Sequence, residues 1–127
     1  MSATEQAPRT ARETQLSAIY PSLRNRRVLI TGGGSGIGES LVEAFARQGS
    51  RVAFVDIAEA PSRALVHRLG SADRPPRYEH CDLTDVKQLR ATIAAIEADF
   101  GSIDVLVNNA ANDDRHALTD VTPEYWN

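Results

Sequence analysis

Apolar positions recur along the chain with two different periods, and their order predicts strands alternating with helices. Short apolar runs at 27–31, 51–56, 78–81 and 103–107 have the length and character of strands that are buried on both faces of a sheet. The segments between them carry apolar residues three and four positions apart, the spacing of one face of a helix. Strands that alternate with helices favour a parallel sheet with right-handed crossovers.

The expected helices run from about 36 to 48, from near Pro61 to 69, and from 85 to about 99. Gly49, Gly70 and Gly101 follow them as stop signals, and Thr84 is the expected cap of the third helix. The inner faces are expected to be Ile37, Leu41, Ala44 and Phe45 in the first helix, Leu65, Val66 and Leu69 in the second, and Val86, Leu89, Ile93 and Ile96 in the third. Thr122-Pro123-Glu124 has the residues of a further helix start.

This succession predicts an α/β fold, a Rossmann-type parallel sheet with strand order 3-2-1-4. It corresponds to a truncated N-terminal half of a doubly wound domain, plus one strand. Residues 1–26 are expected to form a polar and largely disordered tail, pinned to the domain surface near Ile19-Tyr20-Pro21. Residues 27–127 are expected to form a partial domain that ends inside a helix.

The turn between the first strand and the first helix has the sequence Thr31-Gly-Gly-Gly-Ser-Gly-Ile-Gly38. Glycines there permit positive φ and leave no Cβ above the main chain. A phosphate can therefore approach the free N–H groups and the positive dipole end of the new helix. The turn predicts a binding site for a dinucleotide pyrophosphate.

Other readings of the same turn fail on required residues. A P-loop needs lysine where the chain has Glu39, and a hydrolase nucleophile elbow needs glycine where it has Ile37. The common Gly-x-Gly-x-x-Gly fingerprint is also absent as written, because Gly32, Gly36 and Gly38 are spaced differently. A flexible glycine linker does not fit between a strand and a helix.

Asp56 ends the second strand, close to the ~20-residue spacing after the glycine motif at which an acid binds the adenosine ribose. The residue could instead simply cap the next loop, but the glycine motif favours the ribose role. Its carboxylate would repel the 2′-phosphate of NADP by up to about 4 kcal/mol at ~4 Å and an effective dielectric of about 20. Ser35 and Ile57 bring no compensating cation, so NAD is the predicted cofactor.

Composition narrows the choice of partners. The 127 residues carry 14 basic and 17 acidic side chains, a net charge of -3, which favours neither nucleic acid nor an anionic membrane. No apolar run approaches the ~20 residues of a membrane span. Cys81 is the sole cysteine, which fits a reducing compartment, and a cytoplasmic location is expected.

Taken together, the motifs resemble the N-terminal half of the short-chain dehydrogenases/reductases. The matching segments are Thr31 to Gly38, Asp56, Asp82-Leu83 and Asn108-Asn-Ala-Ala111, although the family usually has glycine in place of Ala111. The resemblance implies that Gly32, Ser35, Gly36, Ile37 and Gly38 surround the pyrophosphate. It also implies that Asp82 and Leu83 contact the adenine, and that Asn109 and Ala110 lie near the nicotinamide ribose.

A finer resemblance is to the bacterial NAD-dependent D-xylose 1-dehydrogenases of this family, which oxidise a pentose at C1 to a lactone. It rests on 18–23, on 45–49, and on 112–116 with 120–122. The implied partner is a small-molecule substrate, a sugar or another secondary alcohol, and the loop 112–116 could supply hydrogen bonds to it. A metal site built from Asp113, Asp114 and His116 is not expected, because such crowded loop residues are usually only solvated.

Oxidation of an alcohol needs a base, and in the resembled family this is a tyrosine with a lysine four residues later. The chain has no Tyr-x-x-x-Lys, and Lys87 is its one lysine, so no catalytic residue is assigned. We expect an N-terminal fragment of an NAD-dependent sugar dehydrogenase, inactive alone, whose full-length parent is a homo-oligomer. The alternative is a stand-alone, non-catalytic nucleotide-binding module. A finished domain would not leave the fourth strand as an exposed parallel edge, which favours the fragment.

Overall fold

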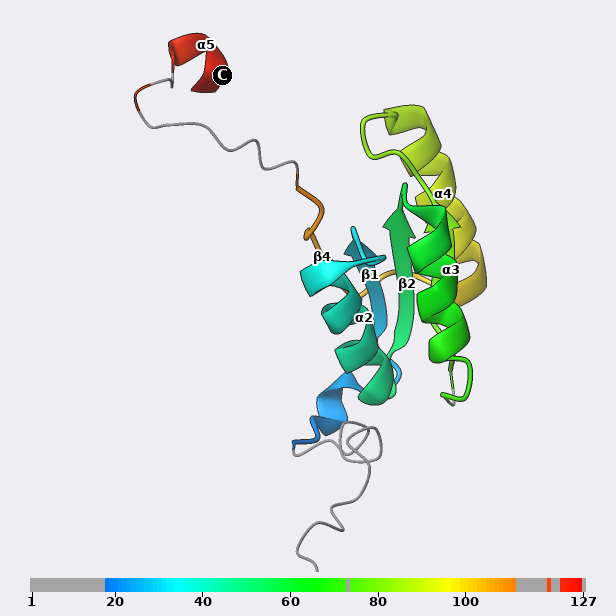
Figure 1. Ribbon diagram of the computed structural model, residues 1–127. Helices are drawn as coiled ribbons and strands as arrows, with labels where there is room; N and C mark the ends of the chain where they lie inside the picture. The colour runs from blue at the N-terminus through cyan, green and yellow to red at the C-terminus, as the bar shows by residue number, and fades with distance from the viewer. Residues whose placement is uncertain (1–17, 73, 112–118, 120–121, 127) are drawn as a thin grey trace, which may run out of the picture.

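A computed structural model describes residues 18–72, 74–111, 119 and 122–126, and within them the predicted parallel sheet is confirmed (Figure 1). The strands lie in the order β3-β2-β1-β4. The elements in chain order are η1 Pro21–Leu23, β1 Arg27–Thr31, α2 Gly36–Arg47, β2 Arg51–Asp56, α3 Glu59–Arg68, β3 Arg77–His80, α4 Val86–Phe100, β4 Val105–Val107 and α5 Pro123–Trp126. Each strand pairs in parallel with its neighbours, and Val28 of β1 stands opposite both Val52 of β2 and Val105 of β4.

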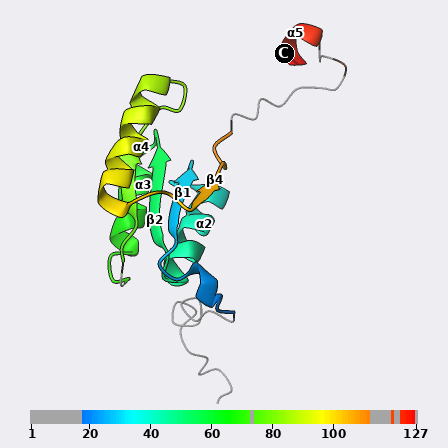
Figure 2. The same cartoon turned by 180° about the vertical axis from the view of Figure 1, so that it is seen from behind.

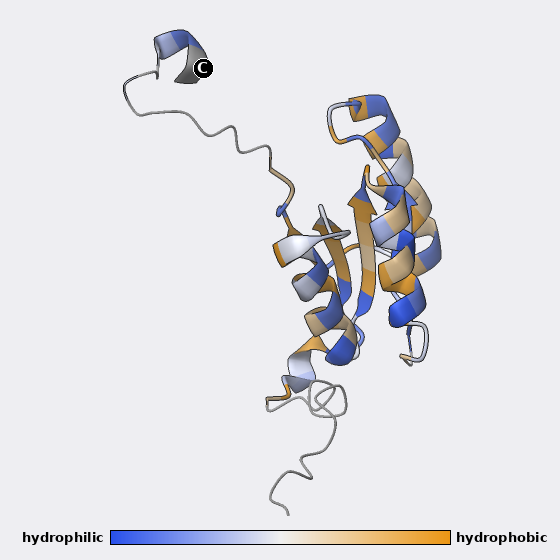
Figure 3. Ribbon diagram, in the orientation of Figure 1, coloured by the Kyte–Doolittle hydropathy of each residue, from blue (hydrophilic) through white to orange (hydrophobic). Residues whose placement is uncertain are grey.

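Helices cover both faces of the sheet, which explains why β1 and β2 are almost uniformly apolar (Figures 1 and 3). On one face, α2 and α3 pack against alternate strand residues such as Ile30 and Phe54. On the other face, seen from behind in Figure 2, α4 packs through Ile96 against Leu29 and Val55. The sheet and its two helical layers hold the carboxyl ends of the strands at one edge, where the glycine turn begins.

The predicted inner face of α2 is partly wrong. Val42 and Ala46 are its buried apolar residues, whereas Ile37 is 75% exposed and Ala44 is exposed. Leu41 and Phe45 pack at the margin of the core, as expected. Ile37 lies in the first turn of α2, beside the glycine turn and past the strand ends. Ala44 lies two positions from both Val42 and Ala46, which places it on the opposite side of the helix.

The start of α4 also differs from the prediction. Asp85, not Thr84, is the N-cap, because its carboxylate accepts a hydrogen bond from the Gln88 N–H at 3.0 Å. The Thr84 hydroxyl donates to Asp82 instead, at 2.7 Å. Val86 is 58% exposed for the same reason as Ile37, since it lies in a first turn that projects past the sheet. The predicted inner residue Ile96 is fully buried.

Strand and helix ends elsewhere shift by small amounts. β3 begins one residue earlier than predicted and ends before Cys81, and β4 begins at Val105 rather than at 103. In α3, Leu65 is buried as expected, and Leu69 just after the helix is buried too. The helix predicted to start near Thr122 is present as α5. None of the helices in the described ranges combines the length and the apolar character needed to cross a membrane.

The segment before β1 lies against the domain. Gln48 accepts a hydrogen bond from the Tyr20 N–H at 2.9 Å and donates one to the Ala18 carbonyl at 3.0 Å. The buried Ser50 hydroxyl donates to the Leu23 carbonyl at 2.6 Å. Residues 18–23 are thus joined to the end of α2, in agreement with the predicted contact near Ile19-Tyr20-Pro21. Residues 1–17, the rest of the predicted tail, lie outside the described residues.

An ion pair joins the starts of β1 and β4. Asp104 accepts hydrogen bonds from the Arg27 backbone N–H at 3.0 Å and from its guanidinium at 3.1 and 3.2 Å. The Asp104 N–H in turn donates to the Arg27 carbonyl at 2.8 Å. The hydrogen bonds from Arg27 hold the pKa of Asp104 below its usual 3.8. The pair therefore stabilises the charged form of Asp104 in the folded chain.

We predict that Asp104→Asn lowers the thermal unfolding midpoint at pH 7, since it removes a charge-assisted pair between two strands. The folded pKa is lower than the unfolded one, so this stabilisation is fully present above pH 3.8 and is lost as the pH falls through the lowered value. Melting curves from pH 7 to pH 2 should therefore show the wild type and the variant converging only in acid. An equal difference at every pH would contradict the electrostatic account, and Glu124→Gln serves as a control for loss of one carboxylate.

Candidate functional site

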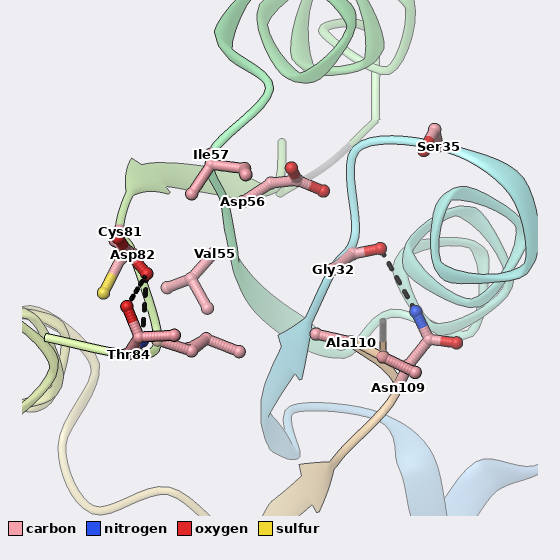
Figure 4. A pocket seen from close by; sticks show the side chains of 12 residues that line it. Gly32, Ser35, Val55, Asp56, Ile57, Cys81, Asp82, Thr84, Asn109 and Ala110 are labelled. Carbon is pink, nitrogen blue, oxygen red and sulfur yellow. Dashed lines mark hydrogen bonds between the residues drawn. The ribbon is translucent and has the colours of Figure 1, made fainter. Parts of the chain in front are cut away.

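A pocket of about 570 Å³ lies at the carboxyl ends of the strands (Figure 4). Ligands bind at this edge of open parallel sheets, where the strand order reverses. Its lining includes these sequence-predicted site residues: Gly32, Ser35, Asp56, Asp82, Leu83, Asn109 and Ala110. It also includes residues that the sequence did not single out for a site: Val55, Ile57, Cys81, Thr84 and Ala111. Gly36, Ile37 and Gly38 belong to the turn and to the first turn of α2, outside this lining.

The glycine turn adopts the conformation that its sequence predicts. Gly32 and Gly36 have φ of 69° and 57°, in the left-handed region that glycine enters without a Cβ clash. A methyl group added at Gly36 would meet no atom within 4 Å, so the space above it is open. The N–H groups in the first turn of a helix have no partner within the helix. This open, N–H-lined turn fits a phosphate group.

Gly38 is glycine for a different reason. A methyl group there would overlap the Gly32 carbonyl oxygen and come within 2.6 Å of the Asn109 amide nitrogen. The same Asn109 amide donates to the Gly32 carbonyl at 3.1 Å, drawn as a dashed line in Figure 4, and to the Thr31 carbonyl at 3.2 Å. The start of α2, the end of β1 and the residues after β4 therefore meet at van der Waals distance.

Thr31 completes this junction and was missed as a functional residue. Its buried hydroxyl accepts hydrogen bonds from the N–H groups of Asn109 and Ala110, both at 3.0 Å. The hydroxyl thus holds the backbone that follows β4 against the end of β1. A threonine at the end of a buried apolar strand was the available signal, because such a hydroxyl needs a hydrogen-bond partner.

Asp56 faces the glycine turn from the end of β2. Its two carboxylate oxygens accept hydrogen bonds from the Gly34 N–H at 2.9 Å and from the Ala58 N–H at 2.8 Å. A methyl group at Gly34 would overlap the Ser62 hydroxyl, so no side chain fits between the turn and α3. The carboxylate is held in place on the pocket wall by backbone groups on both sides.

Asp82 also lines the pocket, after β3, the strand that lies beside β2. Its carboxylate accepts hydrogen bonds from the hydroxyl and the N–H of Thr84 at 2.7 and 2.9 Å (Figure 4). These hydrogen bonds lower the pKa of Asp82 below its usual range, so the carboxylate is charged at neutral pH. Together with Asp56, it gives the pocket lining two carboxylates, and the exposed Ile57 belongs to the same lining.

His67 and His80 are exposed, and Cys81 is buried and belongs to the pocket lining. Over the described ranges, no three His, Cys, Asp or Glu side chains are grouped as metal ligands would be. The loop 112–116, considered for substrate contacts and for metal, lies outside the described residues.

The family model for short chain dehydrogenase matches residues 26–127. The D-xylose 1-dehydrogenase of Caulobacter vibrioides is 56% identical over 110 residues, which are 87% of this chain and 43% of that protein. A probable galactose dehydrogenase of Rhizobium meliloti is 54% identical over 111 residues, again 87% of this chain and 43% of the relative.

Solved structures agree with the fold. A short chain dehydrogenase of Burkholderia cenocepacia, in complex with NADP, superposes with a TM-score of 0.70 and 30% identity, covering 81% of this chain and 42% of that one. The ligand-free aldohexose dehydrogenase of Thermoplasma acidophilum gives a TM-score of 0.64 and 32% identity, covering 84% and 38%. The chain spans less than half the length of these proteins.

We predict that Gly38→Ala destabilises the fold more than Gly36→Ala does. The first change forces a backbone carbonyl to move, which should cost about 3 kcal/mol, whereas the second adds only the penalty of a left-handed alanine, about 1 kcal/mol. Urea unfolding of both variants measures the difference in the free energy of unfolding. Equal losses, or a larger loss for Gly36→Ala, would show that the contact between Gly38 and Gly32 is not limiting.

Proposed function

Because the chain belongs to the short-chain dehydrogenase family, we propose that it is the cofactor-binding part of an NAD-dependent sugar dehydrogenase. The family uses nicotinamide cofactors, and one relative of known structure binds NADP. The observation that carries the choice of NAD is the Asp56 carboxylate, held on the pocket wall beside the glycine turn.

Each predicted site residue has a place in this proposal. The turn formed by Gly32, Ser35, Gly36, Ile37 and Gly38 would hold the pyrophosphate, since the space above Gly36 is open and a helix N-terminus offers N–H groups to an anion. Asp56 would accept hydrogen bonds from the adenosine ribose hydroxyls. Asp82 and Leu83 would lie beside the adenine, and Asn109 and Ala110 beside the nicotinamide ribose.

Charge supports NAD over NADP. The 2′-phosphate of NADP would stand beside Asp56, where two like charges ~4 Å apart repel by up to about 4 kcal/mol at an effective dielectric of about 20. Asp56 cannot easily turn away, because each of its oxygens holds a backbone N–H. The nearest residues of the lining, Ser35 and Ile57, are uncharged.

The names of the relatives support a sugar as the substrate class, and we propose oxidation of an aldose such as D-xylose at C1 to the lactone. When bound, the nicotinamide ring would accept the hydride. The proton would need a separate base, and the printed sequence contains no Tyr-x-x-x-Lys. We therefore propose that catalysis and homo-oligomer formation belong to a longer parent protein. Cys81 as the one cysteine supports a reducing compartment such as the cytoplasm.

Calorimetric titration of the 127-residue chain should show tighter binding of NAD than of NADP, by at least about tenfold. Asp56→Asn removes the charge while keeping a side-chain oxygen, so it should weaken NAD and narrow this ratio. Lys87→Gln, on the outer surface of α4, is the control for a single charge change. Tighter NADP than NAD in the wild type would overturn the proposed cofactor.

The 127-residue chain should show no xylose-dependent reduction of NAD, measured by absorbance at a nicotinamide wavelength, even where it binds NAD. Turnover by the purified chain would overturn the assignment of catalysis to a longer protein. Sequencing the gene downstream of the codon for Asn127 distinguishes a part of a longer sugar dehydrogenase from a stand-alone nucleotide-binding module. A continuing frame with Tyr-x-x-x-Lys supports the sugar dehydrogenase, whereas a stop codon with NAD binding supports a stand-alone nucleotide-binding module.

A further inference from the structure

The short loop between β2 and α3 carries the Asp56 carboxylate, and its backbone is held at several atoms. The Asp56 carbonyl accepts hydrogen bonds from the Tyr78 hydroxyl at 3.0 Å and from the Cys81 N–H at 3.3 Å. The Ala58 N–H donates to the Asp56 side chain, and the Ala58 carbonyl accepts from the Ser62 hydroxyl at 2.6 Å. Between them, Ile57 is 65% exposed and lines the pocket.

The Ser62 hydroxyl of α3 and the Tyr78 hydroxyl of β3 therefore hold the backbone carbonyls of this loop. Ser62, in α3, is fully buried and also lies against Gly34, since a methyl there would overlap its oxygen. Tyr78, in β3, stacks on Phe54 with ring centroids 5.3 Å apart, and the Arg63 guanidinium lies 5.7 Å from its ring centroid. Burial raises the pKa of Tyr78, so its hydroxyl keeps its proton and remains a donor at neutral pH.

We propose that Tyr78 and Ser62 are positioning residues that fix the Asp56 carboxylate and so set the preference of this chain for NAD over NADP. The inference rests on the proposed function. Neither residue touches the cofactor in this proposal: both act through the backbone carbonyls of Asp56 and Ala58. Neither was singled out by the sequence, where Tyr78 reads as part of a strand and Ser62 as part of a helix.

The physical reason is preorganisation. A carboxylate that is already fixed accepts the ribose hydroxyls without losing further side-chain freedom, which favours NAD. The same rigidity prevents it from rotating away from a 2′-phosphate, which disfavours NADP. If the loop is loosened, binding of NAD has to order the Asp56 carboxylate, which lowers the affinity for NAD. The carboxylate can then also move away from a 2′-phosphate, which reduces its repulsion of NADP. The two cofactors should therefore respond differently to one substitution.

A purely structural role would give another pattern. NAD and NADP share the pyrophosphate that the glycine turn would bind, so general damage to the fold weakens both to the same extent. The ratio of the two dissociation constants separates positioning from folding. The amide exchange rate of Gly34 in the cofactor-free chain supplies a second measurement, because its N–H donates to the Asp56 carboxylate.

The test compares Tyr78→Phe and Ser62→Ala with the wild-type chain by calorimetry against NAD and NADP. Tyr20→Phe is the matched control, since Tyr20 is 58% exposed and lies outside the pocket lining. Loss of one hydrogen bond of ordinary strength should weaken NAD about fivefold. NADP affinity should change by less than about twofold, and Gly34 exchange should accelerate by a similar factor to the NAD loss.

The ratio of NAD affinity to NADP affinity and the Gly34 exchange rate together test the positioning role. A lower ratio of NAD to NADP affinity in either variant, with an unchanged ratio in Tyr20→Phe, supports the inference. Equal weakening of both cofactors, or unchanged affinities with unchanged Gly34 exchange, overturns it. If the wild type binds neither nucleotide, it is the proposed function that fails, and faster Gly34 exchange in the variants would still establish the positioning of Asp56.

Discussion

The structure depends on one close approach, where the ends of β1 and β4 and the start of α2 come together. The Thr31 hydroxyl holds the two N–H groups after β4, and the Asn109 amide returns two hydrogen bonds to the carbonyls of Thr31 and Gly32. Gly38 has to lack a side chain for α2 to begin there. The junction sets where the ends of β1 and β4 lie relative to the glycine turn, and so the position of this side of the pocket.

The second constraint is that the pocket is organised by its own hydrogen bonds. The Asp56 carboxylate holds Gly34 and Ala58, and the Thr84 hydroxyl and N–H hold Asp82. Both acids are therefore ordered by hydrogen bonds from neighbouring residues of the chain. In a family whose members use nicotinamide cofactors, such ordering makes the charge pattern of the pocket a property of the chain itself.

The sheet, its strand order and the glycine turn could be predicted because each depends on local residue patterns: buried strands are continuously apolar, and the glycines are placed between a strand and a helix. The phase of α2 could not, because Ile37 satisfies helical spacing yet lies in a turn beyond the sheet. Thr84 and Asp85 are both good caps, and only the geometry shows which carboxylate or hydroxyl reaches Gln88. The partners of Thr31 and Tyr78 lie in segments distant in sequence, so no local pattern names them. The Ser62 hydroxyl bonds the Ala58 carbonyl four residues earlier, but its burial against Gly34 is again a contact between distant segments.

The double attachment of Asp56 has an evolutionary consequence. Under the proposed function, a substitution of Asp56 by a residue without a side-chain acceptor would admit a 2′-phosphate but would also leave the N–H groups of Gly34 and Ala58 without their acceptor. An unsatisfied buried donor costs about 1–3 kcal/mol, a large part of the stability of a small domain. Substitutions that keep a side-chain acceptor at position 56 avoid this cost, so the set of single mutations tolerated at this site is restricted.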